Sequence, residues 1–217
     1  MTQDKPWTQN KSKLKRTFGT FGSPKKRMLI ACEGEKTEPN YFNSFKISSV
    51  RVEPVGGTAI TVVEKALEIA LKANHNKEAF DEVWCVFDKD SVDNPVFIHA
   101  INLAKANNIK IAYSNECFEL WYILHFDYLQ SALSRDRYSD ILSDRLGFQY
   151  EKNSTDMYDK LLARKNTAIA NAERLLCCHS ACVNNKIHFE RFPQLRPAGH
   201  NPSTTVHWLV LELDKLV

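Results

Sequence analysis

Short apolar runs alternate with longer segments of helical periodicity along the first 130 residues, and this alternation limits the folds open to the chain. The run at residues 83–87 is apolar at every position, as in a strand that is covered on both faces of a sheet. Repeats of this kind predict an α/β fold, with a parallel sheet of about four strands joined by crossover helices. The predicted strands are 28–32, 50–55, 83–87 and 109–113, and the predicted helices are 38–46, 58–73, 95–106 and 117–126.

The chain divides into three regions. Residues 1–27 carry eight Lys/Arg and one acid without any periodicity, and they predict a flexible basic arm. This arm either contacts nucleic acid or a partner, or is a solvated tail; composition does not separate the two. Residues 28–130 form the α/β core, and residues 131–217 form a helical extension that packs back on it. The helices expected in the extension are 138–146, 156–165, 167–178 and 204–216.

The pattern of apolar residues excludes several classes of protein. The longest apolar runs are far shorter than the roughly 20 residues that span a bilayer, so we expect no membrane segment. The polar N-terminus lacks the apolar stretch of a secretory signal. Cys32, Cys85 and Cys117 lie in apolar segments, as small buried residues do in a reducing compartment. A cytoplasmic globular protein is therefore expected.

Acidic residues follow three of the predicted strands. Glu33 comes directly after the first strand, Asp88 and Asp90 follow the third, and Glu116 and Glu119 follow the fourth. The carboxyl ends of parallel strands open on one edge of a sheet, so these side chains should converge, with Glu38 and Glu119 nearby. An Asp-x-Asp pair reaches a single ion only if the chain bends between its members. For any one of these acids, the alternative role is to cap a helix or to solvate a loop end.

Several carboxylates in a small volume need either a proton or a cation. Oxygen ligands without nearby His or Cys select a hard ion, and we therefore expect Mg²⁺ or Mn²⁺. Such an ion binds phosphate oxygens and activates water. The pattern thus indicates metal-dependent phosphoryl or phosphodiester chemistry.

Two short motifs resemble a known domain family. Residues 30–38 (IACEGEKTE) resemble the Glu-Gly motif that opens a Toprim domain, and residues 83–90 (VWCVFDKD) resemble its Asp-x-Asp strand. A wider pattern, from about residue 27 to the C-terminus, resembles the RloB-like proteins of bacterial restriction and phage-defence loci. That pattern comprises residues 33–42, 114–126 (SNECFELWYILHF) and 201–204 (NPST). The resemblance implies a Toprim-like, Rossmann-like fold.

The resemblance also implies roles for individual residues. Toprim nucleases use the glutamate after the first strand as general acid/base, which corresponds to Glu33, and they bind metal through the Asp-x-Asp pair, Asp88 and Asp90. The implied metal set is therefore Glu33, Asp88 and Asp90, with a second acid after the Glu-Gly turn. Glu38 is the candidate for that acid, although it lies one residue further along than in the related nucleases, and Glu35 is the alternative.

The third acid of a topoisomerase-type motif would fall at Val92, so Asp93 or Glu119 would have to take its place. The catalytic residues that we expect are therefore Glu33, Asp88, Asp90 and Glu119. RloB-like proteins resemble effectors encoded beside an ABC-type ATPase. The resemblance therefore implies a nuclease effector of anti-phage defence that cleaves RNA such as tRNA, or DNA, together with an ATPase partner.

Five further residues are candidates for substrate binding, each with a plainer alternative. Lys36 is either a phosphate contact or a counter-charge of the acids. Ser114 and Asn115 either steer substrate or cap a helix, and Asn201 and Ser203 either present a helix start to phosphate or cap it. Residues 150–165 interleave aromatic and basic side chains, which suits either RNA stacking or a solvated helix face.

Two other functions stay open at this point. A catalytically inactive Toprim-like docking subunit is favoured by the missing third acid and opposed by the retention of Glu33, Asp88 and Asp90. A receiver-type phosphoacceptor also gathers acids at strand ends, but it needs an acidic pair after the first strand and a single Asp after the third. The sequence does not define the oligomeric state, and homo-oligomers are compatible with it.

Overall fold

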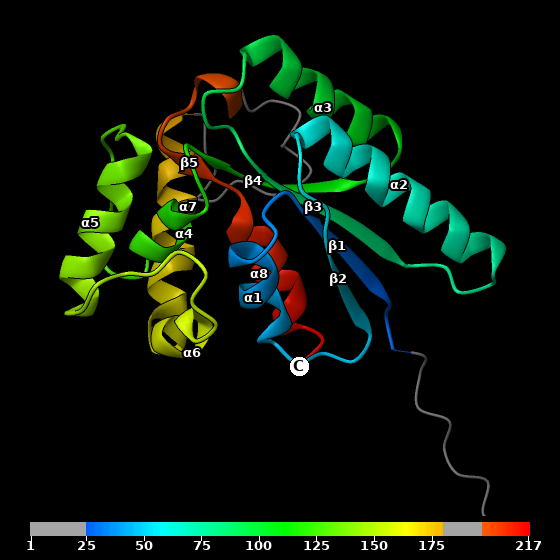
Figure 1. The fold of residues 1–217 in the computed structure, drawn as a ribbon, viewed down its shortest axis with the longest axis horizontal. Helices are drawn as coiled ribbons and strands as arrows, with labels where there is room; N and C mark the ends of the chain where they lie inside the picture. The colour runs from blue at the N-terminus through cyan, green and yellow to red at the C-terminus, as the bar shows by residue number, and fades with distance from the viewer. Residues whose placement is uncertain (1–24, 180–196) are drawn as a thin grey trace, which may run out of the picture.

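The computed structural model describes residues 25–179 and 197–217, and these form a five-stranded sheet with helices on both faces (Figure 1). The strand order is β2-β1-β3-β4-β5, in which the first four are parallel and β5 is antiparallel to β4. The α/β class expected from the sequence is confirmed. The strands are β1 (Met28–Cys32), β2 (Val50–Pro54), β3 (Glu82–Asp88), β4 (Lys110–Asn115) and β5 (Ser203–Thr204).

The helices form two layers, one on each face of the sheet (Figure 1). Helices α2 (Ala59–His75) and α3 (Asn94–Ala106) pack side by side on one face, over β1, β3 and β4. The other face carries α1 (Thr37–Asn43), α4 (Glu119–Ile123), α7 (Lys165–His179) and α8 (Val206–Asp214). Helix α5 (Arg135–Leu146) packs against α4, and α6 (Met157–Leu161) continues into a 3₁₀ turn, Leu162–Arg164.

The central strands are buried because both faces are covered. Every residue of β1 is buried, as are the last five of β3, which explains why neither strand shows an alternation of apolar and polar residues. On α2, Ala59, Val62, Val63 and Ala66 recur at helical spacing and are buried against the sheet. The side chain of Thr58 caps this helix by accepting a hydrogen bond from the Thr61 amide.

The C-terminal segment differs from the prediction. A helix was expected from residue 204, but Ser203 and Thr204 form β5, and α8 begins at Val206. The threonine side chains explain the difference, because Thr204 Oγ1 donates to the Tyr113 carbonyl at 2.9 Å and the Tyr113 amide donates to Thr205 Oγ1 at 3.0 Å. This pairing with β4, about 90 residues away in sequence, overrides the local helical periodicity. No helix of the described residues has the length and apolar character that crossing a membrane requires.

Candidate functional site

The sheet has a topological switch point between β1 and β3. The chain leaves β1 for α1 on one face and leaves β3 for α3 on the other, so the carboxyl ends of these strands border an open crevice, the usual ligand site of such sheets. A cavity of about 440 Å³ lies there. Its lining includes all five acids expected from the sequence, Glu33, Glu38, Asp88, Asp90 and Glu119. The other lining residues are Gly34, Glu35, Lys36, Thr37, Val92, Phe118, Arg135, Lys152 and Asn153.

Glu33 and Asp88 meet through a hydrogen bond between the ends of the two central strands. The Asp88 backbone amide donates to Glu33 Oε2 at 2.9 Å, and the Glu33 amide donates to the Val86 carbonyl at 2.9 Å. The second bond continues the β1–β3 ladder past the Cys32–Val86 pair, so the parallel register places Glu33 opposite Phe87, one residue before Asp88. The convergence of these two acids therefore follows from sheet geometry.

A sharp bend after β3 brings Asp90 to the same cavity. Asp90 has φ = 39°, in the left-handed region that Asp tolerates better than most residues, and its amide donates to the Glu116 carbonyl at 3.0 Å. Between the two acids, Lys89 does not line the cavity; its Nζ donates to the Val92 carbonyl and lies 5.8 Å from the centre of the Phe97 ring of α3. The bend that an Asp-x-Asp pair needs is thus present.

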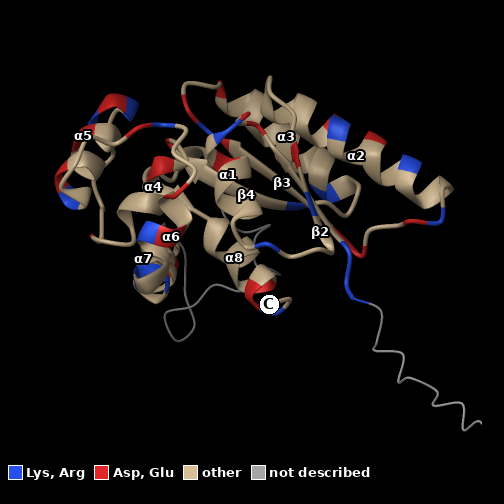
Figure 2. Cartoon of the chain, turned by 60° about the horizontal axis from the view of Figure 1, so that its bottom comes forward, with Lys and Arg blue, Asp and Glu red and all other residues tan. Residues whose placement is uncertain are grey.

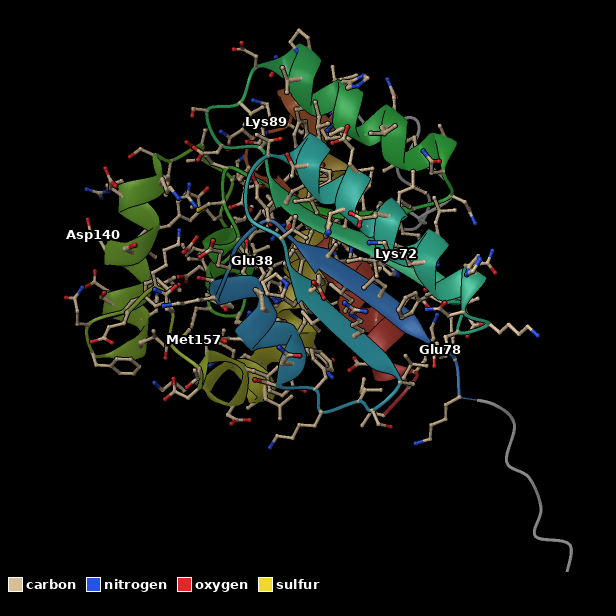
Figure 3. All side chains as sticks on the ribbon, turned by 45° about the vertical axis from the view of Figure 1, so that its right-hand side comes forward. Glu38, Lys72, Glu78, Lys89, Asp140 and Met157 are labelled. Atoms are coloured by element: carbon tan, nitrogen blue, oxygen red, sulfur yellow. The ribbon has the colours of Figure 1, made fainter. Side chains whose placement is uncertain are left out.

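Glu38 lies in the first turn of α1 (Figure 3). Its carboxylate packs directly on Gly34. The side chain is buried, and a Cβ atom at Gly34 would lie 1.8 Å from Glu38 Oε2. Only a glycine leaves room for the carboxylate, which gives the Glu-Gly pair of the sequence a physical reason. Glu35, the alternative second acid, is exposed and approaches Gly56. Of the two residues, Glu38 is the one buried among the acids.

Glu119 brings a further acid from α4. It is 3% exposed, accepts a hydrogen bond from the Tyr150 hydroxyl at 3.3 Å, and has Lys152 Nζ 3.6 Å away. Val92, at the position of the third acid in topoisomerase-type motifs, lines the same cavity with an apolar side chain. Asp93, in contrast, precedes α3 and does not line the cavity. The Asp-x-Asp motif thus supplies no third acid to this cavity, and Glu119 of α4 supplies a carboxylate to it instead.

Like charges and burial act together on these carboxyl groups. Burial raises the pKa of Asp88 well above its usual range, and the charges of Glu38, Glu119 and Glu33 raise it further. Burial likewise raises the pKa of Glu33 and of Glu38, while the amide of Asp88 opposes the rise at Glu33. The neighbouring positive charges thus do not fully offset the repulsion among these carboxylates. A bound cation would reduce that repulsion.

Two cations of the cavity, Arg135 and Lys152, were not among the residues singled out for this site. Arg135 Nη1 lies 2.6 Å from Asp90 Oδ2, and Nη2 lies 3.7 Å from Asp88 Oδ2. In the sequence, nothing distinguishes Arg135 from Arg137, its neighbour in the same charged stretch. Figure 2 shows acidic segments near α4, and both acidic and basic segments along α5. Lys36, which was expected here, lines the cavity with an exposed side chain.

The donor chemistry of the cavity fits a hard divalent cation, because its ligands would be carboxylate oxygens. The ligands are not arrayed around a common point, however: within residues 25–179 and 197–217, no group of three His, Cys, Asp or Glu side chains has the geometry of a metal site. In this arrangement Arg135 contacts the carboxylates of Asp88 and Asp90, and the Asp88 amide donates to Glu33.

Four of the five candidate substrate-binding residues lie outside the cavity lining. Ser114 and Asn115 are buried; Ser114 Oγ is 3.1 Å from Thr204 Oγ1, and the Asn115 side chain donates to two carbonyls of the C-terminal segment. Ser203 Oγ donates to the His200 carbonyl at 2.6 Å and lies 3.1 Å from the hydroxyl of Tyr113 in β4. Asn201 is exposed. The hydrogen bonds of the three buried residues hold the C-terminal segment to β4.

Replacement of Asn115 by Ala tests this tethering role. The Asn115 amide donates to the carbonyls of Pro197 at 3.2 Å and His200 at 2.9 Å, so its loss should lower the free energy of unfolding by about 1–3 kcal/mol. Urea unfolding measures the change, with the exposed Asn201→Ala as control, expected to stay within about 0.5 kcal/mol of wild type. Unchanged stability together with weaker nucleic-acid binding would instead assign Asn115 to the substrate.

Residues 150–165 do not present the stacking face considered from the sequence. Tyr150 is 5% exposed and bonded to Glu119, and the Tyr158 ring packs 5.5 Å from Tyr41 and 4.7 Å from Phe45. These aromatic rings belong to the core because apolar contacts there outweigh exposure to solvent. Of the basic residues, only Lys152 lines the cavity. The basic arm, residues 1–27, lies outside the described residues up to position 24.

The fold and the cavity define an α/β protein with an acidic crevice at the switch point of its sheet. The family model described as RloB-like protein matches residues 28–213, which is most of the chain, so the protein belongs to the RloB-like family. A search of curated proteins found no match, and a search of solved structures found none either.

Proposed function

We propose that the protein is a divalent-metal-dependent nuclease of the Toprim type, which hydrolyses phosphodiester bonds of RNA, tRNA included, or of DNA. The observation that carries the proposal is the convergence of Glu33, Asp88 and Asp90, from two neighbouring strand ends, in one cavity with Glu38 and Glu119. Acidic residues that only solvate loop ends would be exposed, but Glu38, Asp88 and Glu119 are at most 8% exposed. Burying charge without a function is costly.

Each acid has a role in this proposal. Asp88 and Asp90 hold Mg²⁺ or Mn²⁺, with Glu33 and Glu38 at its edge, and the ion would supply charge neutralisation of the phosphate and activation of water. Glu33 moves the proton: the raised pKa of its carboxyl brings it closer to neutral pH, where a general acid/base works best. Glu119, on α4, contributes a further carboxylate to the cavity, and Tyr150 and Lys152 hold its side chain in place.

The cations at the mouth of the cavity suit a polyanionic substrate. Lys36 is exposed, and the side chains of Arg135 and Lys152 are about half exposed, at 41% and 51%, while the acids lie deeper. A phosphate that approaches the acids from solvent therefore meets positive charge first. In the setting implied by the family, the protein is a cytosolic effector of anti-phage defence that an ABC-type ATPase encoded alongside it controls.

Degradation of nucleic acid with and without a chelator tests the proposal. Purified protein is incubated with tRNA and with DNA, each in Mg²⁺, in Mn²⁺ and in EDTA, with and without the co-encoded ATPase. We expect cleavage of at least one substrate in Mg²⁺ or Mn²⁺, and its loss in EDTA. Cleavage that persists in EDTA, or no cleavage of either substrate with the ATPase present, would contradict the proposal.

The second candidate is an inactive docking subunit of a defence complex. The specific observations in its favour are the apolar Val92 in the cavity and the ion pairs that hold Asp88 and Asp90 on Arg135. Calorimetric titration with Mn²⁺ separates the two candidates, because a nuclease must bind the ion at the acids, whereas a docking subunit has no such requirement.

A further inference from the structure

The guanidinium of Arg135 lies on the two acids that Toprim-type chemistry assigns to the metal. Its Nη1 is 2.6 Å from Asp90 Oδ2 and its Nη2 is 3.7 Å from Asp88 Oδ2, so one side chain bridges both carboxylates. Among the ion pairs of the described residues, those of Arg135 are the ones that involve this Asp pair. The contact is charge-assisted and close, and it partly neutralises a buried, like-charged cluster.

A divalent ion and Arg135 compete for the same atoms. An ion ligated by Asp88 and Asp90 would use the carboxylate oxygens that now face the guanidinium, and two cations at that distance repel each other. The ion pair keeps a competing cation on two of the five acids, and in the described part of the chain no three of these acids have metal-ligand geometry. Metal binding requires that Arg135 leave the pair.

The position of Arg135 in the fold allows it to leave. It is the first residue of α5, a helix in which only Tyr138 and Leu142 are buried. The Arg135 side chain is 41% exposed, so it can turn into solvent without breaking core contacts. Arg145, near the other end of the same helix, pairs with Asp127 instead.

We infer that Arg135 is a positioning residue that holds Asp88 and Asp90 in the metal-free protein and is displaced when the divalent ion binds. This inference rests on the proposed function, since it assumes that the acids bind metal, and it adds a control on metal loading. The affinity for the ion is lowered by the fraction of molecules in which Arg135 occupies the acids. Its release then leaves a free cation at the cavity mouth, where the substrate phosphate would arrive.

Calorimetric titration of the full chain with Mn²⁺ tests the inference. Arg135→Gln removes the competing charge, and we expect Mn²⁺ to bind about tenfold more tightly than to wild type. Arg135→Met, which keeps the apolar stem, carries the same expectation if the Gln variant fails to fold. Arg135→Lys retains a competing charge and should return the affinity toward that of wild type.

Two controls separate the ion pair from general charge effects. Arg137→Gln removes one positive charge from an exposed position of α5 that does not line the cavity, and Arg145→Gln makes the same change near the other end of the helix. Both should leave Mn²⁺ affinity within about twofold of wild type. A second readout is thermal unfolding, in which Mn²⁺ should raise the melting temperature of Arg135→Gln more than that of wild type.

The outcomes distinguish the inference from the function on which it rests. Equal Mn²⁺ affinity of wild type and both Arg135 variants would overturn the inference and leave the metal site intact. An equal gain in Arg137→Gln would overturn it as well, since the effect would then come from net charge. If neither wild type nor the Arg135 variants bind Mn²⁺, the proposed metal site itself is wrong, and the inference falls with it.

Discussion

Replacement of Asp88 by Asn is expected to lower metal-dependent cleavage by about a thousandfold or more while the protein stays folded. Asp88 is the most deeply placed acid of its pair, with a side chain 11% exposed against 34% for Asp90. An amide retains the shape of the carboxyl but neither the charge nor the two oxygen ligands. Loss of a metal ligand removes several kcal/mol of transition-state stabilisation, and each 1.4 kcal/mol is a factor of ten.

The same substitution should stabilise the metal-free protein at neutral pH. The pKa of Asp88 is raised in the folded state, so its ionised form is disfavoured there relative to the unfolded chain. This cost is absent below the unfolded pKa of about 3.9, grows as the pH rises above it, and is complete above the folded pKa. Asp88→Asn should therefore unfold at higher urea than wild type at pH 8 in EDTA, and the gain should shrink toward pH 4.

The matched control is Asp93→Asn, because Asp93 is an exposed acid that lies close to the motif but outside the cavity. It should retain wild-type cleavage and stability within about 0.5 kcal/mol. Full cleavage by Asp88→Asn, measured in Mg²⁺ against the wild-type rate, would remove Asp88 from the catalytic site. A loss of stability at pH 8 would show that the ion pair with Arg135 outweighs the repulsion among the acids.

Replacement of Gly34 by Ala is expected to destabilise the protein by about 1–3 kcal/mol and to reduce cleavage at least tenfold. The added Cβ would lie 1.8 Å from Glu38 Oε2 and 2.5 Å from its Cδ, so the buried carboxylate must leave its position. Glu38 is only 5% exposed, so its displaced carboxylate would have to move further into the cavity that it lines, toward the other acids. Gly34→Ala is therefore expected to act by displacing the Glu38 carboxylate, and not by altering the backbone conformation at residue 34.

A double-mutant cycle tests this cause. In a Glu38→Ala background the clash is absent, so Gly34→Ala should cost little stability there, and the two changes should be strongly non-additive. Gly199→Ala is the control, since a Cβ at Gly199 meets no atom within 4 Å. Additive costs in urea unfolding would show that Gly34 is required for a reason other than the room that Glu38 needs.

The residues that the sequence predicts well are those whose position depends on local pattern and sheet geometry. Glu33 and Asp88 follow apolar strands directly, and parallel register alone brings their strand ends together. The sequence required a bend between Asp88 and Asp90 for both to reach one ion but did not predict it, and the structure has that bend at Asp90. For Glu33 and Asp88, knowledge of the strand and of the direction of the sheet is sufficient.

Other features depend on contacts between distant segments and are not readable from the sequence. Arg135 reaches the acids because α5 packs on α4, and no periodicity or motif signals that placement. The strand at Ser203 and Thr204 forms because β4 offers a free edge, although the residues around it have helical spacing. The Asn115 side chain donates hydrogen bonds to the C-terminal segment, and these bonds form only because the tertiary fold brings that segment to β4.

The most direct test of a metal site at the strand ends is an anomalous difference map from crystals of the full chain soaked in Mn²⁺. The account predicts a peak in the cavity, about 2.0–2.3 Å from carboxylate oxygens of Asp88 and of at least one other of the five acids, with Arg135 withdrawn from the pair. A cavity without a peak at saturating Mn²⁺, with Arg135 still on Asp88 and Asp90, would contradict it.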